Sequence, residues 1–195
     1  MKKNVITAPI DKELKDLTIG DIVYINGTIM TARDMAHIRM REYLHRGEEL
    51  PFDLRCGVVF HAGPVVKKMN DESYELSVIG PTTSIRMEPY ADVLVELTIR
   101  AVIGKGGMGE STSKTLQHVG GVYLQAPPGC AVKLAQGVKR IQAVHWLDLG
   151  VPEAVWVLEA NMFGPLIVGM DSKGSSIYRN VRESALSRVE ELIVR

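Results

Sequence analysis

Three short segments of the chain combine a cationic side chain with residues that typically begin a helix or form a tight turn. They are residues 31–37 (TARDMAH), 80–86 (GPTTSIR) and 103–109 (IGKGGMG). The first N–H groups of a helix lack partners and carry partial positive charge, glycine lets a ligand approach the backbone, and arginine or lysine adds the countercharge. Each segment could therefore bind an anion, and a small dianion would need two or three of their cations to converge.

Each segment can also be explained without a ligand. Arg33 could be a solvated residue of a first helical turn, Asp34 a helix cap, and Thr82 and Thr83 further caps. Lys105 is the strongest candidate for function, because a lysine surrounded by four glycines has little helical or packing reason to be there. Spacing alone leaves the functional and the structural interpretation open for the other residues.

Residues 104–109 also match the pattern G-x-G-x-x-G, which in dinucleotide-binding proteins follows a strand and begins a helix. That pattern also requires an acidic residue about 20 positions later, at the end of the next strand, to bind the ribose. Here the next predicted strand ends at Gln125-Ala126-Pro127. A nucleotide-binding module is thus an alternative from a different class, and the missing acid argues against it.

The histidines and cysteines do not form a metal-binding pattern. No histidine has another histidine or a cysteine at the spacing of metal ligands, so we predict no metal ligand in this chain. His37 lies one helical turn after Arg33 and could face the same pocket. Cys56 and Cys130 are far apart and are expected to be reduced. Two thiols cannot hold an iron–sulfur cubane, which needs three or four cysteine ligands.

The composition is that of an ordinary folded protein, with 46% hydrophobic and 24% charged residues among 195. Lysine plus arginine and aspartate plus glutamate number 23 each, so the chain as a whole has no charge that would attract nucleic acid or anionic lipid. No apolar run is long enough to cross a membrane, and the first residues lack the apolar core of a signal peptide. We therefore expect a cytoplasmic protein that binds neither nucleic acid nor membrane.

The three segments must be held in place by strands, which we predict from hydrophobic patterning and turn residues. Asn26-Gly27 is a typical hairpin turn, so it should connect two strands. The expected strands are residues 22–25, 28–30, 57–60, 74–78, 100–103, 121–125, 141–145, 155–159 and 166–170. The last two should be separated by a turn.

Helices are expected between these strands. Thr31 is a predicted N-cap and Gly47 a stop signal, with Met35, Ile38 and Tyr43 on the inner face between them. The other expected helices begin near Pro89, with Val93, Leu94 and Leu97 buried, and cover residues 111–119, 130–136 and about 179–194. Short strands with helices at irregular intervals predict one mixed α/β domain and not a doubly wound sheet.

Five segments of the chain occur in the same order as in a known enzyme family. They are TARDMAH at 31–37, HAGP at 61–64, GPTTSIRM at 80–87, IGKGGM at 103–108 and APPGCA at 126–131. Together they resemble the C-terminal domain, or separate β subunit, of class I fumarases and L-tartrate dehydratases. The resemblance covers roughly residues 17–173. Each segment alone is a modest signal, but five in order are specific.

The resemblance implies a fold and a partner. Residues 1–195 would form a single domain similar to the swivelling β/β/α fold, with mixed sheets and flanking helices, and residues 1–16 would be an N-terminal extension that could contact a partner. The [4Fe–4S] cluster of this family is bound by three cysteines of the N-terminal domain, or α subunit, which this chain lacks. The resemblance therefore implies a cluster-bearing α subunit as partner, in an α2β2 heterotetramer.

The resemblance also implies roles for individual residues. Thr82 falls on the family's catalytic base, and Arg33, Arg86 and Lys105 fall on the cations that bind the substrate carboxylates. Possible supporting positions around them are Asp34, His37, Thr83, Gly104 and Gly106. The general acid of the family is an aspartate of the other subunit, so no residue of this chain is assigned to it.

The function implied is the reversible hydration of fumarate to (S)-malate, a reaction of the tricarboxylic acid cycle. Dehydration of L-tartrate by the same machinery is the alternative, and no residue of this chain identifies the group that would bind the additional hydroxyl. A domain that serves only assembly is a further alternative. It would be favoured if Arg33, Thr82, Arg86 and Lys105 were scattered over the fold.

Overall fold

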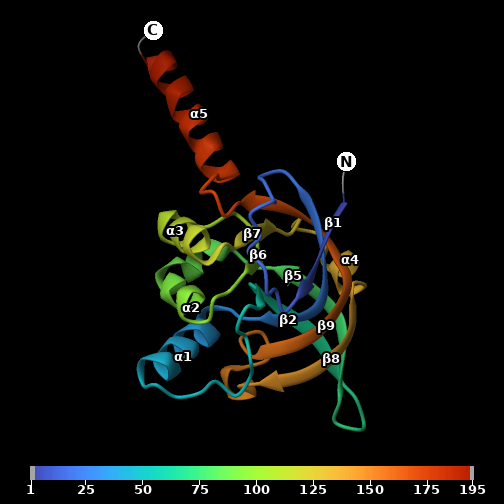
Figure 1. Cartoon of the computed structure of the whole chain (residues 1–195). Coiled ribbons are helices and arrows are strands. Elements are labelled where there is room, and N and C mark those ends of the chain that lie inside the picture. Colours follow the sequence, from blue (N-terminus) through green and yellow to red (C-terminus); the bar gives the residue numbers. More distant parts are fainter. Residues whose placement is uncertain (1–2, 194–195) are drawn as a thin grey trace.

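The computed structural model describes residues 3–193, and the side chains of residues 3–189. Along the chain the elements are β1 (Lys3–Ala8), β2 (Ile22–Thr31), α1 (Asp34–His45), β3 (Val58–Phe60), β4 (Ala62–Lys68), β5 (Tyr74–Pro81), η1 (Ser84–Tyr90), α2 (Ala91–Glu96), β6 (Ala101–Gly104), α3 (Glu110–Val119), β7 (Val122–Gln125), α4 (Ala131–Ala135), β8 (Val138–His145), η2 (Leu147–Leu149), β9 (Val155–Met170) and α5 (Ile177–Ile193). This is the mixed α/β domain that the sequence predicts (Figure 1).

A seven-stranded mixed sheet forms the centre of the molecule, in the order β1-β2-β3-β6-β7-β9-β8. The strands β2, β3, β6 and β7 are parallel to one another, whereas β9 is antiparallel to β7, β8 and β2. Because β9 pairs with β7 near its end and with β2 along most of its length, the strands from β2 to β9 close on themselves. A separate two-stranded sheet consists of β4 and β5.

Two hydrophobic clusters stabilise this arrangement. One lies on the inner side of the curved sheet and includes Phe60, Trp156 and Phe163, all fully buried. The other joins the outer side of β3 and β6 to the helices α1, α2 and α3, and its centre includes Met40 and Leu116. Burial of these apolar surfaces is the main favourable contribution to folding, and it fixes the three helices on one side of the sheet (Figure 1).

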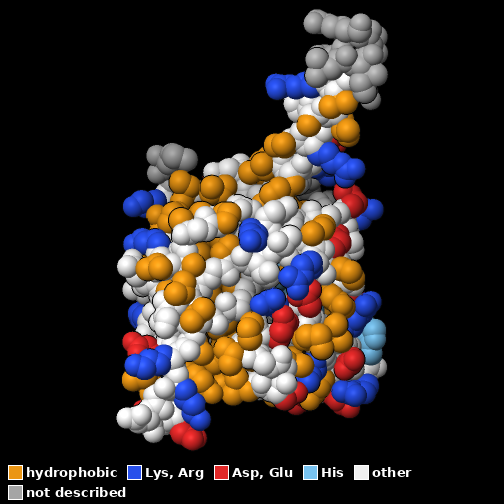
Figure 2. Space-filling model, turned by 180° about the vertical axis from the view of Figure 1, so that it is seen from behind, with side chains coloured by type: hydrophobic (Ala, Val, Ile, Leu, Met, Phe, Trp, Pro, Cys, Tyr) orange, Lys and Arg blue, Asp and Glu red, His pale blue; other side chains and the backbone are white. Residues whose placement is uncertain are grey.

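The C-terminal helix α5 projects away from the rest of the molecule (Figures 1 and 2). Three of its apolar side chains, Val181, Leu186 and Val189, are 64%, 53% and 48% exposed. Its beginning packs on the body, where Tyr178 contacts the ring of Tyr123. No helix among residues 3–193 is long and apolar enough to span a membrane.

The predicted hairpin at Asn26-Gly27 is wrong, because both residues lie inside the continuous strand β2. Gly27 does have a positive φ of +89°. A side chain there would place its Cβ only 2.1 Å from the carbonyl oxygen of Ala8 on the neighbouring strand β1. The glycine thus permits close approach of β1 and an irregular register with β9, not a chain reversal.

Three further expectations near the ends of elements are also wrong. Residues 155–159 and 166–170 belong to one strand, β9, with no turn between them. Thr31 does not cap α1, because it ends β2 and its hydroxyl donates to the Ala154 carbonyl at 3.3 Å. The buried residues of α1 are Ala36, His37 and Met40, whereas Met35 is 45% exposed. The inner face of α1 is therefore rotated by about one residue relative to the predicted one.

Other elements agree with the predictions. The burial of Val93, Leu94 and Leu97 in and after α2 is confirmed, and Gly47 has the positive φ of a helix stop, +67°. The N-terminal segment differs from the prediction, which had no strand before residue 22: β1 pairs with β2, and Leu14 is buried. Its contact with a partner stays a prediction.

Candidate functional site

The candidate site lies at one edge of the large sheet, where four neighbouring parallel strands end. The carboxyl ends of β2, β3, β6 and β7 meet at this edge, so the residues that follow them come together although they are far apart in sequence. Arg33 follows β2, His61 follows β3, Lys105 follows β6, and β7 ends at Gln125. The topology therefore assembles the predicted residues from separate parts of the chain.

Backbone hydrogen bonds join the threonine segment to Lys105. The Lys105 N–H donates to the Thr82 carbonyl at 3.3 Å, and the Ser84 N–H donates to the Lys105 carbonyl at 3.0 Å. Thr83 and Lys105 consequently face each other in an isolated parallel bridge. On its other side, the Thr82 N–H donates to the His61 carbonyl at 2.7 Å. These bonds hold the predicted base and the predicted lysine in fixed relation.

Gly104 allows the close packing beneath this bridge. A Cβ at Gly104 would lie 1.8 Å from Ser84 Oγ, a distance that no real contact permits. The Ser84 hydroxyl accepts a hydrogen bond from the buried Tyr123 hydroxyl at 2.9 Å, and burial raises the pKa of Tyr123. The glycine at position 104 is therefore required by the fold around Lys105.

The two residues after Lys105 turn the chain back toward the sheet. Gly106 and Gly107 have φ values of +80° and +79°, a region that favours glycine. The Gly106 N–H donates to Gln125 Oε1 at 3.2 Å, and the Gly107 N–H donates to the Tyr123 hydroxyl at 3.3 Å. The ring of Tyr178, from the start of α5, packs directly on Gly107. The loop that carries Lys105 is thus held from three sides.

The same glycine segment cannot bind a phosphate as a dinucleotide site does. In such sites the N–H groups at the start of the following helix bind the phosphate. Here the start of α3 is already occupied by the carboxylate of Glu88, which accepts from the Gly109 N–H at 2.7 Å and from the Thr112 N–H at 3.0 Å. Together with the absence of the ribose acid, this contact argues against the nucleotide-binding alternative.

Arg86 is paired with Asp34, the first residue of α1. Its Nε donates to Asp34 Oδ1 at 3.0 Å, and its Nη2 donates to the second carboxylate oxygen. Asp34 is therefore not the helix cap that the sequence suggested, because no side-chain cap is formed at this end of α1. The two-point contact orients the guanidinium group and connects the second predicted segment to the first.

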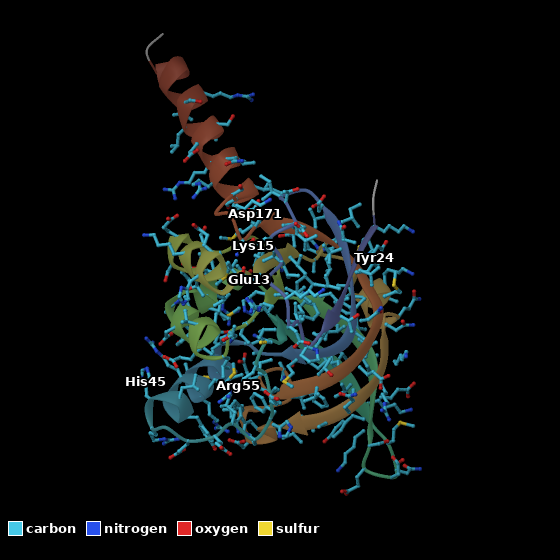
Figure 3. All side chains as sticks on the ribbon, viewed as in Figure 1. Glu13, Lys15, Tyr24, His45, Arg55 and Asp171 are labelled. Atoms are coloured by element: carbon cyan, nitrogen blue, oxygen red, sulfur yellow. The ribbon has the colours of Figure 1, made fainter. Side chains whose placement is uncertain are left out.

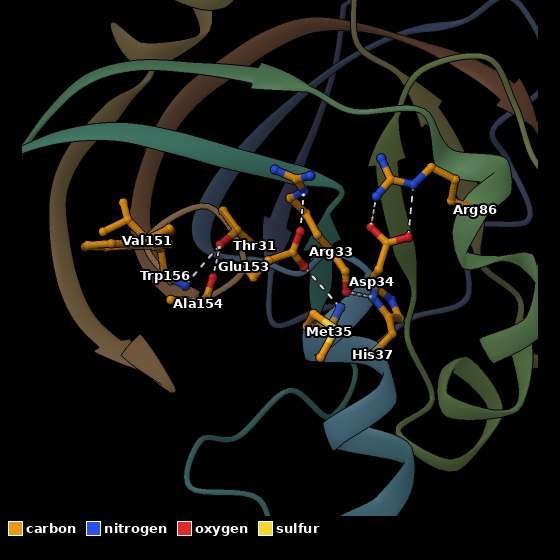
Figure 4. A network of polar contacts seen from close by, with 10 residues as sticks. All are labelled: Thr31, Arg33, Asp34, Met35, His37, Arg86, Val151, Glu153, Ala154 and Trp156. Atoms are coloured by element: carbon orange, nitrogen blue, oxygen red, sulfur yellow. Dashed lines mark hydrogen bonds and ion pairs between the residues drawn. The ribbon is translucent and has the colours of Figure 1, made fainter. Parts of the chain in front are cut away.

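Arg33 is paired with Glu153, an acidic residue that the sequence did not single out. Arg33 Nε lies 3.1 Å from Glu153 Oε1 in an ion pair that lacks a well-aligned hydrogen bond. The other oxygen of Glu153 accepts from the Met35 N–H at 3.0 Å. Figure 4 shows the Arg33 and Arg86 guanidinium groups on the same side of the start of α1. Glu153 escaped prediction because it is 120 residues from Arg33 and belongs to no recognisable local pattern.

The three site cations, Arg33, Arg86 and Lys105, do not have equal environments. Both arginines have an acidic partner, whereas Lys105 forms no ion pair with the side chains of residues 3–189. Lys105 is half-buried. The charges of the three site cations and of the two carboxylates paired with the arginines sum to +1, and the unbalanced charge is that of Lys105.

Two buried histidines lie behind the site. His37 Nδ1 is 2.8 Å from the Arg33 carbonyl oxygen, and its ring meets that of His61 edge to face at 5.2 Å. Burial lowers the pKa of His37 to about 4. Burial and the neighbouring His37 lower the pKa of His61 well below its usual value. Both rings are therefore neutral at pH 7, and neither nitrogen of His61 has a partner among the described residues.

No resident metal site is formed by the described residues, which contain no group of three histidine, cysteine, aspartate or glutamate side chains that could hold an ion. Cys56 and Cys130 are unpaired. A cavity of about 690 Å³ lies elsewhere, between the end of α1, residues 47–55 and Leu97. In Figure 3 the labels of His45 and Arg55 show where this cavity lies. It contains none of the predicted site residues.

Comparison with known proteins adds sequence relatives to this geometry. A family model described as "Fumarase C-terminus" matches residues 2–181. The "Putative L(+)-tartrate dehydratase subunit beta" of Methanocaldococcus jannaschii is 53% identical over 184 residues, which cover 93% of this chain and 94% of that protein. The L(+)-tartrate dehydratase subunit beta of Escherichia coli K12 is 40% identical over 193 residues, 98% of this chain and 94% of that protein.

A third relative has a different length. The "Putative fumarate hydratase class I" of Geobacillus stearothermophilus is 40% identical over 194 residues, which are 97% of this chain but only 37% of that protein. The similarity thus extends over almost the whole chain in all three cases, far beyond the five short segments.

Proposed function

The chain belongs to the Fumarase C-terminus family, as a β subunit of the class I fumarase and tartrate dehydratase hydro-lyases, and we propose that its reaction is the reversible hydration of fumarate to (S)-malate. We also propose that the complete enzyme works in the cytoplasm. The proposal is supported by the position of the three segments that carry the cations: Arg33 and Lys105 follow parallel strands at one sheet edge, and Arg86 pairs with Asp34 beside Arg33. Their positive charge suits a small dianion with a carboxylate at each end.

Each site cation has a distinct part in this proposal. Arg33 and Arg86 are held by acidic partners, so their guanidinium groups are oriented before the substrate arrives. Lys105 supplies the charge that no protein carboxylate among the described side chains balances. Together they would bind the two carboxylates of fumarate and hold its double bond at a defined position beside Thr82.

Thr82 is the proposed base, which removes the proton from the carbon next to a carboxylate of malate and returns it in the other direction. A threonine hydroxyl is a weak base, and its alkoxide form needs nearby positive charge. Lys105 is the proposed source of that charge, since its backbone N–H donates to the Thr82 carbonyl. Neither Thr82 nor Thr83 uses its hydroxyl in a hydrogen bond with the described residues, so both hydroxyls are open to a ligand.

The residues around these four are proposed to support them. Asp34 orients Arg86, and His37 binds the carbonyl of Arg33. Gly104 and Gly106 allow the tight path of the chain that presents Lys105. Thr83 lies opposite Lys105 in the parallel bridge. These contacts are consistent with a site whose cations are preorganised.

The [4Fe–4S] cluster implied by the family does not fit the residues of this chain. Its sequence has two cysteines, and the described residues offer no other set of metal ligands. We therefore propose that a separate α subunit binds the cluster and contributes the general acid, in an α2β2 assembly. The names of the relatives as β subunits support the existence of such a partner.

Dehydration of L-tartrate is the second candidate reaction. It is favoured by the relatives named as tartrate dehydratase β subunits, which this chain matches from end to end as a separate polypeptide. The relative named as a fumarate hydratase is a much longer protein. Because the two substrates differ in hydroxyl groups and not in their carboxylates, the three site cations suit both.

Anaerobic co-expression with the cluster-bearing partner tests the proposal. We expect a brown, oxygen-sensitive complex that hydrates fumarate and dehydrates malate, whereas this chain alone is colourless and inactive. L-tartrate is assayed beside fumarate with the same preparation. A complex that turns over tartrate but not fumarate would replace the first candidate by the second, and full activity of this chain without its partner would refute the subunit assignment.

A further inference from the structure

We propose that Glu153 is a positioning residue that sets the orientation of Arg33 for the substrate carboxylate. This inference rests on the proposed function and assigns a role to a residue outside the five family-like segments. Its basis is a pair of contacts made by one carboxylate, one to Arg33 and one to the backbone that begins α1. Figure 4 shows Glu153 between the two.

The segment that carries Glu153 is fixed to the same strand end as Arg33. The Thr31 hydroxyl donates to the Ala154 carbonyl at 3.3 Å and accepts from the Trp156 N–H at 3.0 Å. The Trp156 indole N–H donates to the Val151 carbonyl at 2.9 Å. The backbone after Glu153 is therefore tied to residue 31, two positions before Arg33, and the backbone before Glu153 is tied to Trp156. This arrangement leaves the carboxylate little freedom relative to the guanidinium group.

The contact with Glu153 leaves the two terminal guanidinium nitrogens of Arg33 available for a ligand. Glu153 faces Nε, and neither terminal nitrogen of Arg33 forms a hydrogen bond with the described residues. Those two nitrogens are the pair that can bind a carboxylate at two points. An arginine side chain without such a contact samples many rotamers and must be ordered when the ligand binds. Glu153 removes that requirement and keeps the terminal nitrogens free.

If Glu153 served only to stabilise the start of α1, only its Oε2 oxygen would be needed. Glu153 Oε2 accepts from the Met35 N–H and so satisfies one free donor at the start of α1. Glu153→Gln separates the two contacts, because the amide oxygen can still accept from Met35 while the amide nitrogen would face Arg33. The substitution removes the charge that orients Arg33 and leaves the helix start bonded.

The chain offers a matched control in the same region. Asp148, in η2, makes a two-point ion pair with Arg39 of α1 at 2.9 and 2.7 Å. Asp148→Asn therefore also replaces a carboxylate by an amide in an ion pair between α1 and the segment around η2, but this pair does not include Arg33. Because Asp148 is largely exposed, its loss should affect stability little.

The experiment measures kcat and KM for fumarate and malate in the anaerobic complex of both subunits, with cluster content and thermal unfolding as checks. We expect Glu153→Gln to raise KM about tenfold or more, with a smaller change in kcat, and with the midpoint of unfolding unchanged. Asp148→Asn should match the wild type. In a background of Arg33→Lys, the further change Glu153→Gln should have no additional effect on KM, because the group that it orients is gone.

The outcomes separate this inference from the function itself. Wild-type KM in the Glu153→Gln complex would overturn the inference while leaving the hydratase assignment intact. An equal, additive effect in the Arg33→Lys background would also overturn it, because Glu153 would then act independently of Arg33. A wild-type complex inactive on fumarate and on tartrate would refute the proposed function before the variants are compared.

Discussion

Replacement of Lys105 by alanine is the most direct test of the site, because its effects on activity and on stability should differ sharply. Lys105 forms no ion pair among the described side chains. The backbone of its loop bonds to Thr82 and Ser84 and to the side chains of Gln125 and Tyr123, and the substitution keeps these bonds. The free energy of unfolding should therefore change by no more than about 0.5 kcal/mol.

The effect on catalysis follows from the lost charge. A hydrogen bond from a charged donor contributes about 1.5–3 kcal/mol, and each 1.36 kcal/mol of transition-state stabilisation is about tenfold in rate. The loss of this contact alone should lower kcat/KM roughly 10- to 100-fold. The alkoxide of Thr82 would also lose the positive charge that Lys105 is proposed to supply, so the total fall should be about a hundredfold or more.

The assay compares kcat/KM of the anaerobic complexes that contain wild-type, Lys105→Ala or Lys105→Gln β subunits. Lys67→Ala is the control, since this exposed lysine lies in β4 beyond the part that faces the site. Denaturant unfolding of the same proteins measures stability. If both Lys105 variants keep normal kcat/KM, Lys105 does not bind the substrate. If they lose stability by several kcal/mol instead, its role is structural.

Two further predictions concern the fold beneath the site. Gly104→Ala would place a Cβ 1.8 Å from Ser84 Oγ, so it should lower the free energy of unfolding by about 1–3 kcal/mol. Denaturant unfolding measures this change, and an unchanged midpoint of unfolding would contradict the close packing of Gly104 on Ser84. The pKa values of His37 and His61 are lowered in the folded protein, so the unfolded chain binds more protons below about pH 6.5. The free energy of unfolding should therefore fall as the pH drops from about 6.5 towards 4, by up to about 1.4 kcal/mol per pH unit for each histidine. His37→Asn should reduce this slope, and an equal slope in the variant would show that other groups cause it.

Local patterns in the sequence are sufficient to select the segments that supply the proposed site. The residues that begin helices or turns with a cation, namely Arg33, Arg86 and Lys105, can be selected from composition and spacing within each segment. The buried face of α2 follows from hydrophobic periodicity in the same way. The prediction for α2 succeeds because it depends on interactions within a few residues along the chain, where the preferences of apolar side chains are strong.

Contacts with distant strands overturned other local signals. Asn26-Gly27 has the composition of a hairpin turn, yet β1 and β9 pair with both sides of it and keep the strand continuous. The same is true of the predicted turn within β9, which three neighbouring strands hold extended. Hydrogen bonds to neighbouring strands outweigh a turn preference of a few residues.

The sequence by itself determined which segments could bind an anion, which family they resemble, and that two cysteines are too few for an iron–sulfur cluster. Only the tertiary structure decided that the segments carrying the three site cations lie at one sheet edge, because that placement depends on the parallel order of β2, β3 and β6. It also decided that Glu153 faces Arg33 and that Glu88 occupies the start of α3. The charge around a site depends on which side chains the fold brings within a few ångströms, and spacing along the chain does not reveal those neighbours.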